Sequence, residues 1–147
     1  MRFRSRAEAR TEDVPMDVSG YWKVKQVLML DDSGRTWRDL EEVLQRPDID
    51  SDLLRVRDER CVFCPDGYSR TIAPLPEGVT QEEIDSAVAR GRLELYGDGF
   101  MVVGKNGWKE ENGRILMNAG AIGDSQWEEI TEAGGMIEFL MYRYVRA

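Results

Sequence analysis

Apolar and polar residues alternate along a stretch near the start of the chain, residues 20–30. Successive side chains of a β-strand point to opposite faces, so this alternation predicts a strand with one buried face. The outer face carries the two charged residues Lys23 and Lys25, and we expect it to meet solvent. The inward face then comprises Trp22, Val24, Gln26, Leu28 and Leu30.

A second alternating stretch, residues 136–146, lies at the end of the chain. Its inward face comprises Ile137, Phe139, Met141, Arg143 and Val145. If the first and last strands pair antiparallel, the start of one lies beside the end of the other. Trp22 and Arg143 are then expected to meet on the inner face, where a guanidinium can stack on the indole, with Arg146 as the competing arginine.

Between these two stretches, short apolar runs are separated by turn residues. Asn112-Gly113, which joins residues 108–111 to residues 114–117, is the strongest hairpin signal in the chain. Further strands are predicted over residues 54–57, 60–64, 68–72, 93–96, 100–103 and 126–130. Short strands with tight turns are typical of closed up-and-down barrels. The sequence therefore predicts a mostly β fold, an antiparallel up-and-down barrel with two short helices.

The first of the two predicted helices covers residues 36–46, where apolar residues recur at helical spacing before Pro47. It either covers the mouth of the barrel or plugs one end as ordinary core. The second begins at the capping box formed by Thr80 and Glu83 and ends at Gly91. We expect its apolar side, which includes Val88, to pack on the sheet, so Val88→Asp is predicted to destabilise the fold strongly.

Gly20-x-Trp22 opening the first strand, with Arg143 near the end of the last, resembles the signature of the calycins, the superfamily of lipocalins and fatty-acid-binding proteins. The resemblance implies a barrel that binds a small hydrophobic or amphipathic, fatty-acid-like ligand without catalysis. The wall of the binding site would comprise Trp22, Val24, Leu28, Phe139 and Met141. Arg143 would meet a carboxylate group of the ligand. In the alternative interpretation, the tryptophan and the arginine form only a structural clasp around a filled interior.

Composition adds bounds on domains and partners. The chain has 147 residues, of which 41% are hydrophobic and 33% charged, with a net charge of −8. One domain is expected over residues 17–147, preceded by a basic, loosely attached or disordered tail over residues 1–16. The acidic charge argues against nucleic acid and anionic membranes as partners. No apolar run is long enough for a membrane span, and a cytoplasmic location is expected; the oligomeric state is left open.

The chain contains no histidine, which removes the usual catalytic triads and the commonest metal ligand. Cys61 and Cys64 form a C-x-x-C pair within a predicted hairpin, with no further Cys to complete a zinc site. Both are therefore interpreted as structural thiols. Neither a metal nor a cofactor is predicted.

Two functions other than ligand binding stay open. One is an isomerase or hydratase that uses carboxylates and tyrosines inside the barrel, although no convincing pair is found among the strand carboxylates Glu94, Glu128 and Glu129. The other is an interaction protein that uses exposed aromatic residues, of which the candidates are Tyr21, Tyr142 and Tyr144.

Overall fold

The computed structural model describes residues 17–147 except residues 33, 50 and 119–125, so the predicted tail over residues 1–16 lies outside the described residues. The strands are β1 (Tyr21–Asp31), β2 (Gly34–Asp39), β3 (Arg60–Phe63), β4 (Tyr68–Pro74), β5 (Phe100–Glu111), β6 (Arg114–Asn118), β7 (Trp127–Ala133), β8 (Met136–Phe139) and β9 (Tyr142–Arg146). The described helices are α2 (Leu40–Val43), α3 (Ser51–Val56) and α4 (Gln81–Ala89). Helices in this part of the chain all fall short of the length and apolar character that crossing a bilayer requires.

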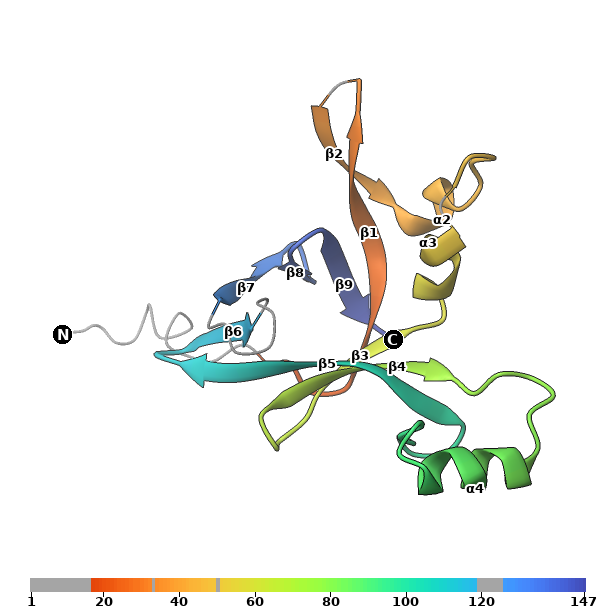
Figure 1. Cartoon of the computed structure of the whole chain (residues 1–147). Helices are drawn as coiled ribbons and strands as arrows, with labels where there is room; N and C mark the ends of the chain where they lie inside the picture. The colour runs from red at the N-terminus through yellow and green to blue at the C-terminus, as the bar shows by residue number, and fades with distance from the viewer. Residues whose placement is uncertain (1–16, 33, 50, 119–125) are drawn as a thin grey trace.

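Antiparallel pairing closes the sheet into a barrel. Strand neighbours follow the order β1-β3-β4-β5-β6-β7-β8-β9, and β9 pairs back onto β1, so eight strands form a ring. The remaining strand, β2, pairs with the second half of β1. The two strands project from the barrel as a hairpin (Figure 1). The predicted fold class, a mostly β antiparallel up-and-down barrel with a few short helices, is confirmed, as is the pairing of the two chain ends.

An irregularity in β1 changes which of its residues face inward. Trp22 pairs with Arg146 and Val24 with Tyr144, but the register shifts between Val24 and Gln26. An extra residue in one strand reverses the faces that follow it. Beyond the shift the buried residue is therefore Val27, which is 4% exposed, and the prediction that Gln26 and Leu28 face inward was wrong.

The predicted last strand, residues 136–146, is in fact a tight hairpin. Strands β8 and β9 are joined by Leu140 and Met141, and Leu140 adopts a positive φ of 56°. Phe139 pairs directly with Tyr142, and directly opposed residues share a face of the sheet. The inward residues of β9 are consequently Tyr142, Tyr144 and Arg146, whereas Arg143 and Val145 point outward, the reverse of the prediction.

Three other predicted elements differ from the structure. Within the helix predicted over residues 36–46, only Leu40–Val43 are helical, as the single turn of α2. Residues 36–39 belong to β2, because pairing with β1 outweighs their helical spacing. Residues 54–57 lie mostly in α3 rather than in a strand. Residues 93–96 contribute only an isolated bridge between Leu95 and Met101. The hairpin at Asn112-Gly113 is confirmed, with Glu111 opposite Arg114.

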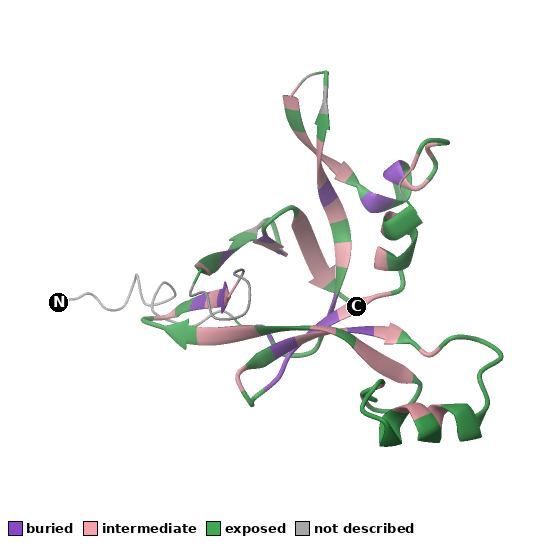
Figure 2. Ribbon diagram, in the orientation of Figure 1, coloured by how far each residue is buried: buried purple, intermediate pink, exposed green. Residues whose placement is uncertain are grey.

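Buried residues gather where β3 crosses the barrel wall (Figure 2), and they belong to two apolar clusters. Inside the barrel, one core cluster comprises Val18, Trp22, Cys61, Phe63, Ile115, Met117, Ile130, Ile137 and Phe139. A smaller cluster of Val62, Cys64 and Ile72 packs against Tyr96, Phe100 and Val102 on the other side of the wall. The larger of the two clusters therefore forms the core inside the barrel.

Helix α4 begins as predicted but does not pack as predicted. The Thr80 hydroxyl accepts a hydrogen bond from the Glu83 amide, the Glu83 carboxylate accepts one from the Thr80 amide, and Gly91 follows with a positive φ. No residue of this helix is buried, and Val88 is 42% exposed. The expectation that Val88 packs on the sheet was therefore wrong. The capping box at the first turn stabilises α4 instead.

Candidate functional site

The first and last strands are joined by an arginine stacked on Trp22, and that arginine is Arg146. Its guanidinium carbon lies 4.4 Å from the indole centroid, and Nη2 donates to the Asp17 carbonyl at 2.7 Å. Nη1 donates to the Ser19 carbonyl. The indole Nε1 of Trp22 donates to the Val18 carbonyl at 2.9 Å. These contacts form a clasp, defined by Gly20, Trp22 and Arg146, that fixes the segment before β1 onto the end of β9.

Arg143 lies on the outer face of the barrel rather than against Trp22. Its guanidinium carbon is 4.2 Å from the centroid of Trp37 in β2. Nε donates to the Glu138 carboxylate at 3.0 Å, and Nη1 donates to the Gln26 side chain at 3.1 Å. The expected contact between Trp22 and Arg143 was wrong because the turn at Leu140 and Met141 reverses the faces of β9.

Next to the clasp, the inner wall of the barrel borders a cavity of about 120 Å³. Strand β1 contributes Trp22 and Val24 to its lining, and β9 contributes Tyr142 and Tyr144. Pairing of Val24 with Tyr144 places residues of both strands on this inner face. The wall of the cavity is therefore built by the same strand pair that closes the barrel.

The end of α3 and the residues after it cover this cavity, which we call the α3 cavity. Val56 and Glu59 line it from that side, and the lining continues along β3 and β4 through Arg60, Cys61 and Thr71. No residue of α3 is buried, so little packing holds the helix in place. A liquid water molecule occupies about 30 Å³, so the α3 cavity has room for about four waters.

Glu59 is the one carboxylate in the lining of the α3 cavity as the structure describes it. Burial raises the pKa of Glu59, and the positive charge of Arg55 opposes this rise. Each nearby arginine has another partner: Arg55 pairs with Asp52, and Arg57 lies 4.0 Å from Asp58. Arg60, which also lines the cavity, donates from Nη1 to the carbonyls of Arg57 and Glu59. Within the described residues, the Glu59 side chain has no hydrogen bond or ion pair, so its oxygens are available to a ligand.

Two phenols and a thiol share the cavity with this carboxylate. Burial raises the pKa of Tyr144 and of Tyr142, and the negative charge of Glu59 adds to both shifts, so both phenols are neutral near pH 7. Neither phenol has a hydrogen bond to another described residue. Burial, aided by Cys64, raises the pKa of Cys61 to about 12, so this thiol is protonated and weakly nucleophilic.

The structure brings only part of the predicted site together. Trp22 and Val24 line the α3 cavity, and Phe139 is buried in the core. Leu28 and Met141 instead line a hollow of about 390 Å³ on the outside of the barrel, which Leu140 and Arg35 also border. Arg143 lines neither the α3 cavity nor this outer hollow. Whether any of these residues binds a ligand stays a prediction.

Sequence reasoning missed Glu59 as a site residue and placed Tyr142 and Tyr144 on the solvent face. Only a turn signal at residues 140–141 would have reversed the assignment of the two tyrosines.

The three strand carboxylates weighed for an enzyme lie outside the cavity lining. Glu94 lies near Arg70 and Lys105, at 3.6 and 3.4 Å. Glu128 and Glu129 lie on exposed positions of β7. An enzyme in this barrel would therefore depend on Glu59 rather than on any of these three.

Cys61 and Cys64 are both free and buried, on opposite sides of the barrel wall. Because the wall separates the two thiols, a disulfide between them is disfavoured. In the part of the chain that the structure describes, no three His, Cys, Asp or Glu side chains are grouped so as to hold a metal ion.

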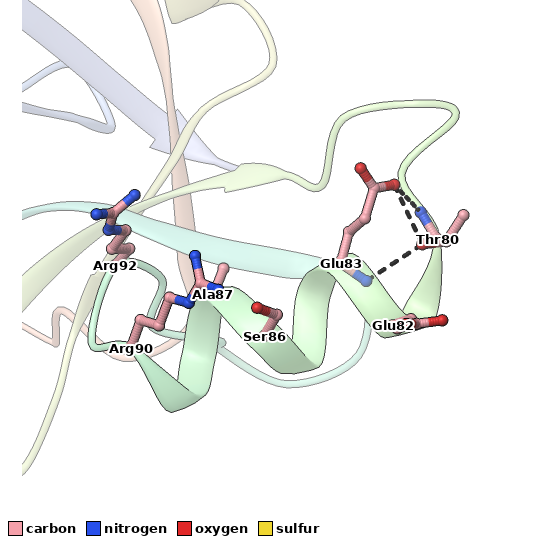
Figure 3. Close-up of a pocket in the computed structure, with 7 residues that line it drawn as sticks. All are labelled: Thr80, Glu82, Glu83, Ser86, Ala87, Arg90 and Arg92. Atoms are coloured by element: carbon pink, nitrogen blue, oxygen red, sulfur yellow. Dashed lines mark hydrogen bonds between the residues drawn. The ribbon is translucent and has the colours of Figure 1, made fainter.

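A wider hollow of about 560 Å³ runs along α4 (Figure 3). Its lining comprises Thr80, Glu82, Glu83, Ser86, Ala87, Arg90 and Arg92. All of these except Ala87 are exposed, and Thr80 and Glu83 already satisfy one another in the capping box. This hollow is a shallow surface groove beside a helix, so the smaller α3 cavity is the better candidate for a ligand site.

Comparison with protein-family models finds no family that matches the chain, and searches of curated proteins and of solved structures find no match either.

Proposed function

We propose that the barrel is a non-catalytic binding module for one small amphipathic molecule held in the α3 cavity. The observation that carries this proposal is a cavity with an apolar wall, Trp22, Val24 and Val56, facing a carboxylate and two phenols that have no hydrogen-bond partners among the described residues. Apolar walls with a few convergent polar groups are typical of small-molecule sites.

The size of the cavity limits the ligand. Pockets for drug-sized ligands usually measure about 300–1,000 Å³, well above 120 Å³. A ligand of about four to six non-hydrogen atoms fits the volume of about four waters. A fatty-acid-like chain of greater length would need α3 to move away, and the lack of buried residues in α3 makes that displacement inexpensive.

We also infer a distant relationship to the calycins. An eight-stranded up-and-down barrel and a clasp of Gly20, Trp22 and an arginine of the last strand support this inference. The arginine that corresponds to the calycin signature is then Arg146, not Arg143. Under this inference the clasp is structural, because Arg146 is held by the carbonyls of Asp17 and Ser19.

A cavity-filling variant tests the proposed binding function. Ligand-observed NMR with butan-1-ol, butyrate, butylammonium and octanoate should detect binding of at least one probe to the unmodified protein. Val24→Phe, which places a larger ring in the cavity wall, should weaken that binding by about tenfold or more. Val103→Phe, at an exposed position of β5, is the matched control and should leave it unchanged. Failure of every probe to bind would favour the filled structural barrel instead.

The half-buried Glu59 beside two neutral phenols also favours a second candidate, a barrel enzyme of isomerase or hydratase type. A carboxyl group with a raised pKa can act as a general acid or base. Measurement of the Glu59 pKa by carbon-13 NMR tests this candidate, since a value in the ordinary range would remove its support.

A further inference from the structure

We propose that the α3 cavity selects ligands carrying an ammonium group, which the Glu59 carboxylate and the rings of Tyr142 and Tyr144 would bind together. This inference rests on the proposed function and names the chemical class of its ligand. It also reverses the preference for carboxylates that the calycin resemblance implies. The unpaired carboxylate and the two aromatic rings favour such a ligand, and the size of the cavity limits it to a short chain.

The Glu59 carboxylate favours a cation because it has no ion-pair partner among the described residues. Glu59 is flanked in the sequence by arginines, yet Arg55 pairs with Asp52 and Arg57 lies beside Asp58. Arg60 directs Nη1 to the carbonyls of Arg57 and Glu59, at 3.1 and 2.8 Å. Backbone carbonyls thus hold Nη1 of Arg60, which lines the cavity beside Glu59. No described side chain forms a hydrogen bond or an ion pair with the Glu59 carboxylate, although the charge of Arg55 acts on it.

Aromatic rings complete a site for a cation. Tyr142 and Tyr144 lie edge to face with their centroids 6.1 Å apart, and both line the cavity. Ammonium groups bind the faces of such rings, most strongly where water is excluded. Trp22 already binds the Arg146 guanidinium in this way, so the two tyrosine rings are the ones left to a ligand. The tyrosine hydroxyls can accept hydrogen bonds from the same ammonium group.

The outer arginine removes the main argument for a carboxylate ligand. Arg143 is engaged by Glu138, Gln26 and Trp37 on the far side of the wall. A ligand carboxylate in the cavity would lie near Glu59, and two like charges in a half-buried site repel. Arg60 also lines the cavity, but the carbonyls of Arg57 and Glu59 already hold its Nη1. A short alkyl chain along Trp22, Val24 and Val56 suits the apolar wall, so a small primary amine combines both parts of the cavity.

An NMR titration with three probes of equal chain length tests the ammonium preference. Butylammonium, butan-1-ol and butyrate are titrated at pH 7 into the full chain. Butylammonium should bind about fivefold or more tightly than butan-1-ol, and butyrate most weakly. Glu59→Gln, which keeps the size of the side chain, should remove the preference for butylammonium over butan-1-ol. Glu128→Gln, at an exposed carboxylate of β7, should retain it.

A pair of tyrosine variants tests the aromatic part separately. Tyr142→Phe keeps the ring and should hold butylammonium affinity within about threefold, whereas Tyr142→Leu removes the ring and should weaken it by about threefold to tenfold. Thermal melts establish that each variant is folded. Tighter binding of butan-1-ol or butyrate would overturn the ammonium inference and leave the proposed function standing. Failure of all three probes to bind would overturn both.

Discussion

At Gly20, the lack of a side chain leaves room for the Arg146 guanidinium that stacks on Trp22. The residue has a φ of +89°, and a Cβ there would lie 3.2 Å from Nη1 of Arg146. Gly67 has the same φ, but a Cβ there would meet nothing within 4 Å. Substituting Gly67 by alanine therefore measures the free-energy cost of a positive φ alone. Substituting Gly20 measures that cost together with the cost of displacing Arg146.

We expect Gly20→Ala to lower the free energy of unfolding by ~2–3 kcal/mol and Gly67→Ala by ~1 kcal/mol. The difference arises because only the first substitution disturbs the Arg146 hydrogen bonds. Urea denaturation of both variants measures it. Equal losses would show that the arginine moves aside freely and that the clasp contributes little to stability.

Glu59 should make stability depend on pH in an unusual direction for a carboxylate. Burial raises its folded-state pKa, so the folded protein binds a proton that the unfolded chain has already released. Stability from this group is therefore lost as the pH rises from about 4.5, the unfolded value, through the higher folded value. Glu59→Gln should melt at a higher temperature than the unmodified protein at pH 7. The advantage should vanish near pH 4, and an advantage independent of pH would contradict the assignment.

Cys61 should resist alkylation in the folded protein. Its pKa of about 12, raised by burial and by Cys64, leaves almost no thiolate at pH 8, and the thiolate is the reactive form. Mass spectrometry after treatment with iodoacetamide should find Cys61 unmodified in buffer. In urea both cysteines should react. Rapid modification of Cys61 in the folded state would mean that the inner wall opens to solvent.

Secondary-structure elements with a strong local sequence signal were predictable, whereas those with a weak signal were not. Asn112 and Gly113 both adopt positive φ in their hairpin, as the residue types require. Leu140 also adopts a positive φ, but leucine gives no turn signal, so the pattern predicts one strand where the chain forms two. The register shift beside Lys25 has no sequence signature either. Each of these two irregularities reverses the faces of the residues that follow it.

Helix α4 offers a test of how loosely an element can attach to this fold. Val88 is 42% exposed, so Val88→Asp should change the free energy of unfolding by only ~0.5 kcal/mol. Ile72→Ala, at a fully buried position of β4, should lower it by ~2–5 kcal/mol. Urea denaturation of the two variants compares them. A large loss for Val88→Asp would show that the helix packs more tightly than its exposure indicates.

Only those site residues that lie in a regularly alternating part of a strand were predictable from the sequence. Trp22 and Val24 come before the register shift, so their inward faces followed from the pattern. Glu59 borders the α3 cavity together with residues of β1 and β9, which lie far from it in the sequence. Tyr142 and Tyr144 depend on the hairpin at Leu140. Local patterns carry none of this information.

For the whole molecule, closure by β1 and β9 links stability to the proposed binding. The same strand pair carries the clasp and four of the nine residues that line the cavity, so β1 and β9 must pair before the cavity exists. The β1–β2 hairpin extends beyond the ring (Figure 1) and adds Trp37, which holds Arg143 on the outer face. Arg143 therefore takes no part in the lining of the α3 cavity.

The indole N–H signals of Trp22, Trp37, Trp108 and Trp127 in a proton–nitrogen NMR spectrum test this arrangement most directly. Each is assigned by single substitution to phenylalanine, and butylammonium, butan-1-ol and butyrate are then titrated in separate samples. A ligand in the α3 cavity should shift the Trp22 signal and leave that of Trp37, on the outer face, unmoved. A shift of Trp37 without Trp22, or no shift with any probe, would contradict a binding site inside the barrel.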